Sequence, residues 1–238
     1  MNTIQGKTAY ITGGSKGIGY GVAEELMKLG VNVVLTSRST ESAEDAAQQL
    51  NEQNYDGKAL GVAADVRNLE QQQSAIRQGV SAFGQIDYVI ANAGVGHFAP
   101  IEELTAEQWQ QTIDVNLTGV FNSVKAGLDQ LIANEGYLIT IASLAGTNFF
   151  AKGSAYNASK FGLVGFTQAV MLDVRSKGVK VSTIMPGSVA TFFNGHTPSA
   201  EDAWKIQPED IGQIVADLVR MPARTLPSKV EVRPSQPG

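Results

Sequence analysis

A tyrosine and a lysine four residues apart, with a serine upstream, form the group most suited to chemistry in this chain. Tyr156 and Lys160 would share one face of a helix, so the lysine ammonium can approach the phenol. A nearby cation favours the phenolate and lowers the pKa of tyrosine from its ordinary value of about 10. Ser143 ends the apolar run 137–143 and offers a hydroxyl that can hold a substrate oxygen. Each residue alone is more typical of a surface pair or a strand end, but together they favour proton transfer to a carbonyl.

A glycine-rich loop follows the first apolar run and opens the first helical stretch. Residues 12–19 read Thr-Gly-Gly-Ser-Lys-Gly-Ile-Gly. Glycines let the backbone turn tightly and approach a pyrophosphate at the helix N-terminus. An ordinary glycine-rich turn is the alternative, but the strand–loop–helix context favours a dinucleotide site. We expect this site to include Gly13, Ser15, Lys16, Gly17, Ile18 and Gly19.

The end of the second expected strand distinguishes between two dinucleotides. An acidic residue there would bind the free ribose hydroxyls of NAD. This chain has Ser37 and Arg38 instead, and Arg38 can pair with a 2′-phosphate in a fork geometry. Lys16 can add a second positive charge. The two cations could also be solvated surface residues, but the missing acid predicts NADP(H) as the cofactor.

The elements that must position these residues follow from an alternation of short apolar runs and longer amphipathic stretches. Strands are expected at 8–12, 31–36, 59–64, 86–91, 138–142, 179–185 and 230–232. Helices are expected at 18–29, 42–53, 68–83, 105–134, 154–176 and 208–221. This order predicts an α/β fold, a single-domain Rossmann-type doubly wound parallel sheet with helices on both faces. Residues 1–238 would form one dinucleotide-binding and catalytic domain, with a substrate lid at about 188–207.

Composition limits the classes of function. A net charge of −5 and a pI near 5.1 argue against a nucleic-acid partner, which usually needs a basic face. No apolar run approaches the roughly 20 residues of a membrane span, and no signal peptide is visible. The chain has no cysteine and two histidines, so we expect no metal site. A cytoplasmic location is the resulting prediction.

Taken together, the motifs resemble those of the short-chain dehydrogenase/reductase family, in its compact single-domain branch. The resemblance covers residues 7 to about 233 and rests on several signatures in order. Beyond the glycine loop these are Asp65-Val66, Asn92-Ala93-Gly94, Asn116, Ser143, Tyr156-x-x-x-Lys160, and Pro186-Gly187 with Thr191. The resemblance implies an adenine contact at Asp65 and Val66, a cofactor wall at Asn92, Ala93 and Gly94, and a nicotinamide contact at Pro186, Gly187, Val189 and Thr191.

The resemblance also implies reversible reduction of a ketone or aldehyde by NADPH. Tyr156 would donate the proton, Ser143 would hold the carbonyl oxygen, and Lys160 would tune Tyr156 and bind the nicotinamide ribose. Asn116 would hold a water that resupplies the proton. The chain departs from the family pattern at Ala91, where a second asparagine is common. It also lacks the Asp-Gly-Gly ending common in the similar 3-oxoacyl carrier-protein reductases, which argues against a role in fatty-acid synthesis.

Several alternatives stay open at this point. A non-catalytic NADP(H)-binding redox sensor could use the same fold, although it has no need of Tyr156. A sugar-nucleotide epimerase would need more chain after Pro186. His97 could bind the small-molecule substrate. Five aromatic residues could line an apolar pocket or serve lid packing and subunit contact: Phe149, Phe150, Phe192, Phe193 and Trp204. A homo-oligomer, dimer or tetramer, is expected through Phe121, Val124, Phe161, Val164 and Phe166.

Overall fold

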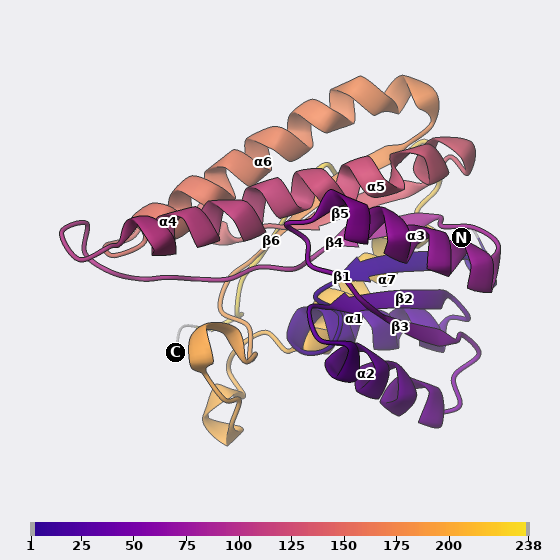
Figure 1. Ribbon diagram of the computed structural model, residues 1–238, viewed down its shortest axis with the longest axis horizontal. Coiled ribbons are helices and arrows are strands. Elements are labelled where there is room, and N and C mark those ends of the chain that lie inside the picture. Colours follow the sequence, from indigo (N-terminus) through magenta and orange to yellow (C-terminus); the bar gives the residue numbers. More distant parts are fainter. Residues whose placement is uncertain (1–2, 237–238) are drawn as a thin grey trace.

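The computed structural model describes residues 3–236, and its centre is a seven-stranded parallel sheet (Figure 1). The strand order is β3-β2-β1-β4-β5-β6-β7. The strands are β1 (Thr8–Thr12), β2 (Asn32–Ser37), β3 (Ala59–Ala63), β4 (Tyr88–Ala91), β5 (Tyr137–Ile141), β6 (Lys180–Pro186) and β7 (Lys229–Val232). The order reverses between β1 and β4, and such a switch point leaves a crevice at the carboxyl ends of the strands. The predicted doubly wound α/β fold is confirmed.

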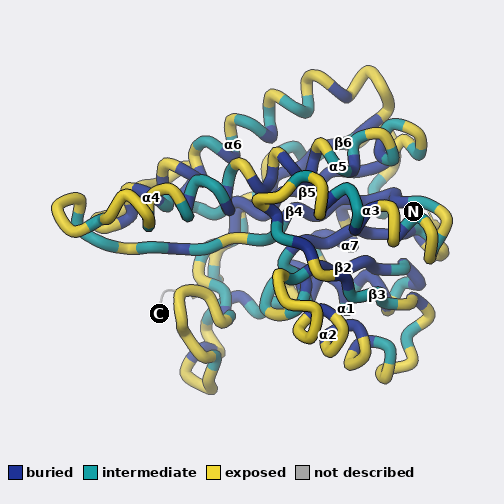
Figure 2. Tube along the Cα trace, in the orientation of Figure 1, coloured by how far each residue is buried: buried dark blue, intermediate teal, exposed yellow. Residues whose placement is uncertain are grey.

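Helices cover both faces of the sheet (Figure 1). One face carries α1 (Gly17–Lys28), α2 (Thr40–Glu52) and α7 (Pro208–Arg220), and the other carries α3 (Leu69–Phe83), α5 (Gly119–Ala133) and α6 (Ser154–Val174). Neighbouring strand residues point to opposite sides: Ile11 joins the core under the first group, and Tyr10 joins the core under the second. The five inner strands are buried almost throughout, as a parallel sheet with two covered faces requires, whereas the edge strands β3 and β7 are only partly buried (Figure 2).

Two glycines allow α1 and α7 to cross closely beneath the sheet. A Cβ on Gly21 would lie 2.6 Å from the backbone of Pro208, and a Cβ on Gly212 would lie 2.5 Å from the carbonyl oxygen of Gly21. Real Cβ atoms do not approach other atoms so closely, so larger residues would force the helices apart. This crossing fixes α1, whose N-terminus carries the glycine loop.

The long helix predicted at 105–134 is interrupted by one wider turn. It consists of α4 (Ala106–Ile113), a π-helical turn (Asp114–Thr118) and α5. A capping box starts it: the Thr105 side chain accepts a hydrogen bond from the backbone N–H of Gln108, and the Gln108 side chain accepts one from the backbone N–H of Thr105. Single π turns are frequent at functional sites, and Asn116 lies inside this one.

The other helix and strand boundaries differ from the predicted ones by one or two residues. At the start of a helix, the capping residue determines where the first turn begins. The second helix begins at Thr40 rather than 42, because the Ser39 hydroxyl accepts a hydrogen bond from the Ser42 N–H. Gln207 is the N-cap of α7, and Pro208 occupies the first helical position, where its missing N–H costs nothing. No helix between residues 3 and 236 is long and apolar enough to cross a membrane.

Candidate active site

A cavity of about 910 Å³ opens at the carboxyl ends of the central strands. This is a common size for a small-molecule site, and the switch point of the sheet is its expected place. Of the residues predicted from the sequence, all but Gly19 and Asn116 line it. The lining residues among them are Gly13, Ser15, Lys16, Gly17, Ile18, Ser37, Arg38, Asp65, Val66, Asn92, Ala93, Gly94, Ser143, Tyr156, Lys160, Pro186, Gly187, Val189 and Thr191.

The glycine loop is braced from behind by Asn92. The side-chain amide of Asn92 donates to the carbonyl oxygens of Thr12 (2.9 Å) and Gly13 (3.0 Å). Gly19 lies against this brace, where a Cβ would be 2.5 Å from the Gly13 carbonyl oxygen. Gly13 and Gly17 adopt positive φ angles of 64° and 58°, which strain any other residue. The loop is therefore held as a tight turn, with the N-terminus of α1 at the cavity. This geometry fits a pyrophosphate.

The charges at the end of β2 suit an additional phosphate. Arg38 lines the cavity just after β2, Lys16 lines it from the glycine loop, and both are exposed. Asp65 is the only carboxylate among the described lining residues, and Arg67 pairs with it through its Nε (3.0 Å) and Nη2 (2.6 Å) atoms. This pairing holds the pKa of Asp65 below its usual range. Because Asp65 is paired with Arg67, its carboxylate competes less with a bound phosphate for Lys16 and Arg38. Arg67 was not predicted from the sequence, although a basic residue two positions after Asp65 was a visible signal.

Ser143, Tyr156 and Lys160 come together at the other end of the cavity. The side chains of Ser143 and Tyr156 share a hydrogen bond. Lys160 is 4% exposed, and its Nζ atom lies 5.7 Å from the centroid of the Tyr156 ring. The same ammonium donates a hydrogen bond of 3.1 Å to the carbonyl oxygen of Ile141, at the end of β5. The first turns of α6 thus place the phenol and the cation on one face, beside the strand end that carries Ser143.

The pKa values at this centre are governed by burial. Burial raises the pKa of Tyr156, and the hydrogen bond with Ser143 opposes that rise. Burial lowers the pKa of Lys160 to about 8. The structure therefore differs from the expectation of an acidified phenol: removal of the hydroxyl from water outweighs a cation that is directed at Ile141. The direction of this shift favours the neutral phenol, which is the form that can donate a proton.

Asn116 lies behind the cavity and joins two of its walls. Its Oδ1 atom accepts from the backbone N–H of Val95 (2.8 Å), and its Nδ2 atom donates to the Val95 carbonyl (2.9 Å) and to the Ser159 hydroxyl (3.0 Å). The π turn gives the asparagine this inward position. Asn116 therefore ties the loop after β4 to α6 next to Lys160. The contact of Ser159 with Asn116 was not predicted from the sequence. The position of this serine between Tyr156 and Lys160 was its only indication.

Comparison with known proteins assigns the family. The model described as short chain dehydrogenase matches residues 7–202. The chain belongs to this short-chain dehydrogenase family. Glucose 1-dehydrogenase 2 of Bacillus subtilis is 36% identical over 91% of this chain and 88% of its own length.

Two solved structures support the assignment. An alcohol dehydrogenase of the archaeon Thermococcus sibiricus, complexed with 5-hydroxy-NADP, superposes with a TM-score of 0.88 at 29% identity and covers 98% of this chain and 99% of its own. A metagenomic short-chain oxidoreductase in complex with NADP has a TM-score of 0.84 at 32% identity, over 99% of this chain and 100% of its own. The oxidoreductase class of this short-chain dehydrogenase is therefore established.

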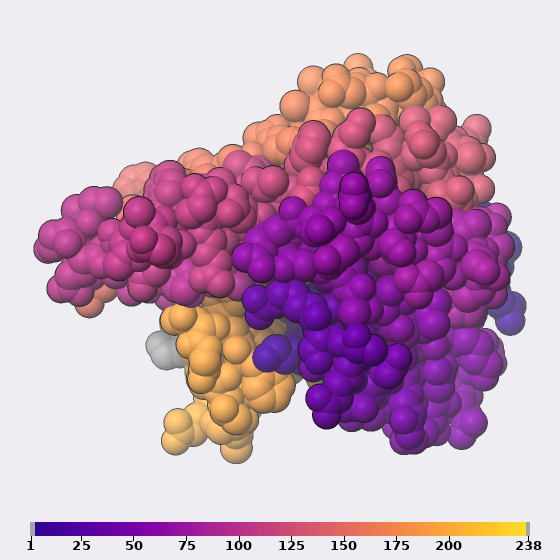
Figure 3. All heavy atoms as spheres, in the orientation of Figure 1, coloured from indigo at the N-terminus to yellow at the C-terminus, as the bar shows by residue number. Residues whose placement is uncertain are grey.

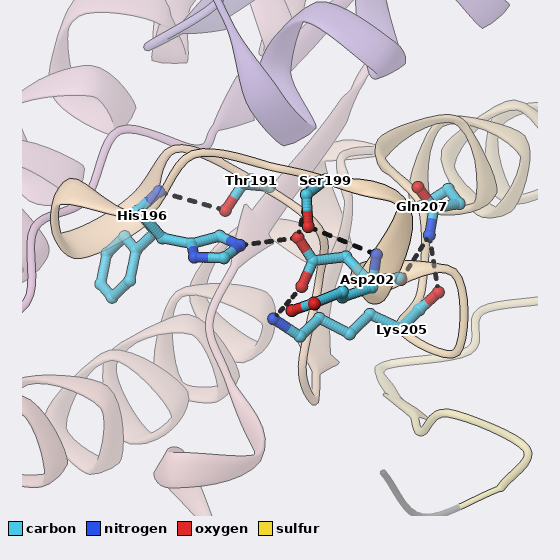
Figure 4. A network of polar contacts seen from close by, with 8 residues as sticks. Thr191, His196, Ser199, Asp202, Lys205 and Gln207 are labelled. Atoms are coloured by element: carbon cyan, nitrogen blue, oxygen red, sulfur yellow. Dashed lines mark hydrogen bonds and ion pairs between the residues drawn. The ribbon is translucent and has the colours of Figure 1, made fainter.

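The segment expected to be a lid is an ordered loop with its own polar core (Figure 4). It closes at its base through a bridge between Val189 and Ile206. Inside it, Asp202 is buried and accepts from His196 Nε2 (2.7 Å), from Lys205 Nζ and from the Ser199 N–H (3.0 Å). Lys205 and then His196 hold the pKa of Asp202 well below its usual range.

This loop stands out from the body of the short-chain dehydrogenase beside the glycine loop. Figure 3 shows it in orange below the layer formed by α4, next to the N-terminal part of the chain. A Cβ on Gly17 would lie 3.3 Å from Thr191, and the Lys16 ammonium lies 5.6 Å from the centroid of the Phe192 ring. The loop therefore touches the dinucleotide side of the cavity.

The remaining candidate residues divide between the cavity and the surface. His97 lines the cavity and makes a 2.7 Å hydrogen bond with Gln111. Phe192 and Phe193 also line it, whereas Phe149, Phe150 and Trp204 do not. Phe149 is 86% exposed. The sequence analysis did not select Phe98, whose ring lies 5.4 Å from that of Tyr156; its place soon after the Asn-Ala-Gly turn was the available signal. Within residues 3–236 no cluster of His, Asp and Glu could hold a metal ion.

Proposed function

We propose that this protein is an NADPH-dependent carbonyl reductase that reduces a ketone or aldehyde to an alcohol, reversibly. The observation that carries the proposal is the placement of Tyr156 and Ser143 hydroxyls beside the buried Lys160, at one end of a cavity whose other end has the glycine loop. The known family members complexed with NADP or 5-hydroxy-NADP support this assignment.

The side chains of the cavity have distinct roles in the proposed reaction. The bound cofactor supplies a hydride to the carbonyl carbon. Tyr156 transfers its phenolic proton to the carbonyl oxygen, so that one hydride and one proton convert C=O into CH–OH. Ser143 donates to the same oxygen and holds it near Tyr156. The neutral phenol described above is the form required for this direction.

Lys160 and Asn116 support the proton transfer. As Tyr156 loses its proton, the Lys160 ammonium stabilises the phenolate at close range in a site with little water. The Lys160 ammonium also has N–H groups that remain available to donate hydrogen bonds to the nicotinamide ribose. Asn116, fixed between Val95 and Ser159, would hold the water that returns a proton to this pair.

Cofactor preference for NADPH over NADH belongs to the same proposal. Arg38 after β2 and Lys16 in the glycine loop provide two cations that line the cavity, and the Asp65 carboxylate is paired with Arg67. A guanidinium binds a phosphate through parallel hydrogen bonds, which makes Arg38 the main contact for the 2′-phosphate.

We also propose a homo-oligomer and a cytoplasmic location. The outer faces of α5 and α6 expose Phe121 (45%) and Phe161 (44%), and the rings of Phe121 and Phe166 lie 6.4 Å apart. Contiguous exposed apolar side chains on long helices are typical of a subunit contact.

A screen of carbonyl compounds tests the function directly. The purified protein is mixed with NADPH and a diketone, a quinone or an acetoacetyl thioester, and the loss of NADPH is followed. Turnover of at least one carbonyl with formation of the alcohol supports the proposal. Tight NADPH binding without turnover of any carbonyl contradicts it and favours the redox sensor.

A further inference from the structure

Two phenylalanine rings pack against the proposed proton donor, and a third packs against one of them. The Phe98 ring lies 5.4 Å from the Tyr156 ring in an edge-on arrangement, and the Phe193 ring lies 5.7 Å from it. The centroid of the Phe98 ring also lies 6.3 Å from that of Phe193 and 5.7 Å from that of Phe150. These rings come from three separate segments: the loop after β4, the loop before α6 and the lid. We call Phe98, Phe150 and Phe193 the aromatic cluster.

Gly96 makes the approach of the aromatic cluster to Tyr156 possible. A Cβ at position 96 would lie 2.6 Å from Phe193 Cζ and 2.9 Å from Phe98 Cζ. The missing side chain therefore leaves room for planar groups beside the phenol. Phe193 lines the cavity and is 36% exposed, so its ring has surface available for a ligand. Phe98 is not among the lining residues; its ring packs against those of Tyr156 and Phe193 and supports them.

Four of the polar side chains that line this part of the cavity are already paired. His97 bonds to Gln111, while His196 and Lys205 both bond to the carboxylate of Asp202. The one carboxylate among the described lining residues, Asp65, lies at the opposite end and is paired with Arg67. A substrate with many hydroxyls would find few open acceptors here, and leaving its polar groups unpaired is costly. A carboxylate substrate would compete with Asp202 for its cations.

We infer that the substrate is an uncharged carbonyl compound with a planar aromatic substituent, such as an aryl ketone or aryl diketone, whose ring packs against Phe193, the ring that Phe98 supports. This inference rests on the proposed carbonyl reductase function and adds the substrate class. The carbonyl oxygen reaches Ser143 and Tyr156, while the ring lies against the aromatic cluster. Offset or edge-on ring pairs contribute binding beyond their buried area, and a non-planar group of equal size does not gain this contribution.

Matched substrates test this inference. The values of kcat/KM with NADPH are compared for phenylpropanedione, cyclohexylpropanedione and butanedione, and the oxidation of D-glucose with NADP is measured in parallel. We expect phenylpropanedione to exceed cyclohexylpropanedione about fivefold and butanedione by more than tenfold, with glucose oxidation near background.

Two substitutions connect the preference to the aromatic cluster. Phe193→Leu and Phe98→Leu keep an apolar side chain and remove the ring, so each should reduce the phenyl-to-cyclohexyl ratio to within about twofold of one. Phe149→Leu is the matched control: this ring is 86% exposed and outside the cavity, and its loss should leave the ratio unchanged. Thermal melting establishes that the variants are folded.

The possible failures are distinguishable. Reduction of butanedione or cyclohexylpropanedione as efficiently as phenylpropanedione, or efficient oxidation of glucose, overturns the aryl inference and leaves the carbonyl reductase standing. A phenyl preference that survives both substitutions also overturns it. No turnover with any of these compounds or any other carbonyl overturns the proposed function, and the inference falls with it.

Discussion

At the scale of single residues, burial of Lys160 has opposite consequences for stability and for chemistry. Its surroundings lower its pKa from 10.5 to about 8. A shift of this size corresponds to roughly 3 kcal/mol of unfavourable free energy for the charged form. Because the unfolded state keeps the higher pKa, the cost is complete below about pH 8 and declines as the pH rises toward 10.5. The same dry environment strengthens the interaction between the ammonium and a tyrosinate.

The lowered pKa of Lys160 predicts a pH dependence of carbonyl reduction. Lys160 is charged below about 8 and neutral above it, and only the charged form stabilises the forming phenolate. We expect kcat/KM for a ketone with NADPH to be level near neutral pH and to fall through an apparent pKa of about 8. A profile that stays level well into the alkaline range, with the protein folded by circular dichroism, would contradict this role.

Arg38 carries the cofactor preference in our proposal. Replacing it with alanine removes a bidentate phosphate contact, and hydrogen bonds to charged groups contribute about 1.5–3 kcal/mol. Arg38→Ala should therefore raise KM for NADPH by roughly ten- to a hundredfold and change KM for NADH less than twofold. Steady-state kinetics with both nucleotides measure this. Equal effects on the two would mean that Arg38 is a surface cation without a phosphate to bind.

At the scale of elements, the loop at 188–207, which we propose acts as a lid, is organised by one buried carboxylate. Asp202 joins His196, Lys205 and the Ser199 backbone, which are spread over residues 196–205. A charged group with several charge-assisted hydrogen bonds orders a loop that has few apolar contacts of its own. Because the pKa of Asp202 is well below its usual range, these pairs persist at mildly acidic pH.

The variant Asp202→Asn should loosen the lid while leaving the sheet intact. We expect limited proteolysis between residues 188 and 207 to become severalfold faster, and the protection given by NADPH with a carbonyl substrate to decrease. Asp217→Asn is a control, because this carboxylate is 54% exposed on α7. Cleavage at the wild-type rate, with and without ligands, would show that Asp202 does not organise the lid.

The elements differ in how well the sequence predicts them. Continuous apolar runs located the strands, because both faces of a parallel sheet are buried. The π turn at 114–118 was missed, since one extra residue in a helical turn barely changes an apolar pattern of period 3.6. The pairing of Asp202 with His196 and Lys205 was also missed, because it depends on the path of an irregular loop.

The candidate site was predictable in its parts and less so in its energetics. Spacing alone placed Tyr156 near Lys160 and the glycine loop at a helix N-terminus. The sign of the Tyr156 pKa shift was wrong, because burial of a phenol depends on tertiary packing that the sequence does not contain. Phe98 was missed for a similar reason: only the folded loop after β4 directs its ring at Tyr156.

At the scale of the whole molecule, the carboxyl ends of the parallel strands bring the cavity-lining loops together. The glycine loop, Asp65, Asn92 and Ser143 each follow a different strand, and the parallel order brings these strand ends together. The long helices α5 and α6 then lie on one outer face, where Phe121 and Phe161 are half-exposed.

This outer face yields a prediction about assembly. A glutamate in place of Phe161 would put a charge into the proposed contact, and an unpaired buried charge opposes association. We expect wild-type protein to have the mass of a dimer or tetramer by light scattering, and Phe161→Glu to shift it toward the monomer. Phe149→Glu serves as the control. A monomeric wild-type protein would remove the proposed interface.

The most direct test of the central claim compares wild type with Tyr156→Phe in the presence of NADPH and a carbonyl that the wild type reduces. The variant keeps the ring and loses only the proton donor. We predict that kcat falls by a factor of about a hundred to ten thousand, while the dissociation constant for NADPH changes less than twofold. Turnover near the wild-type rate with normal NADPH binding would contradict the account, because another group would then have to supply the proton.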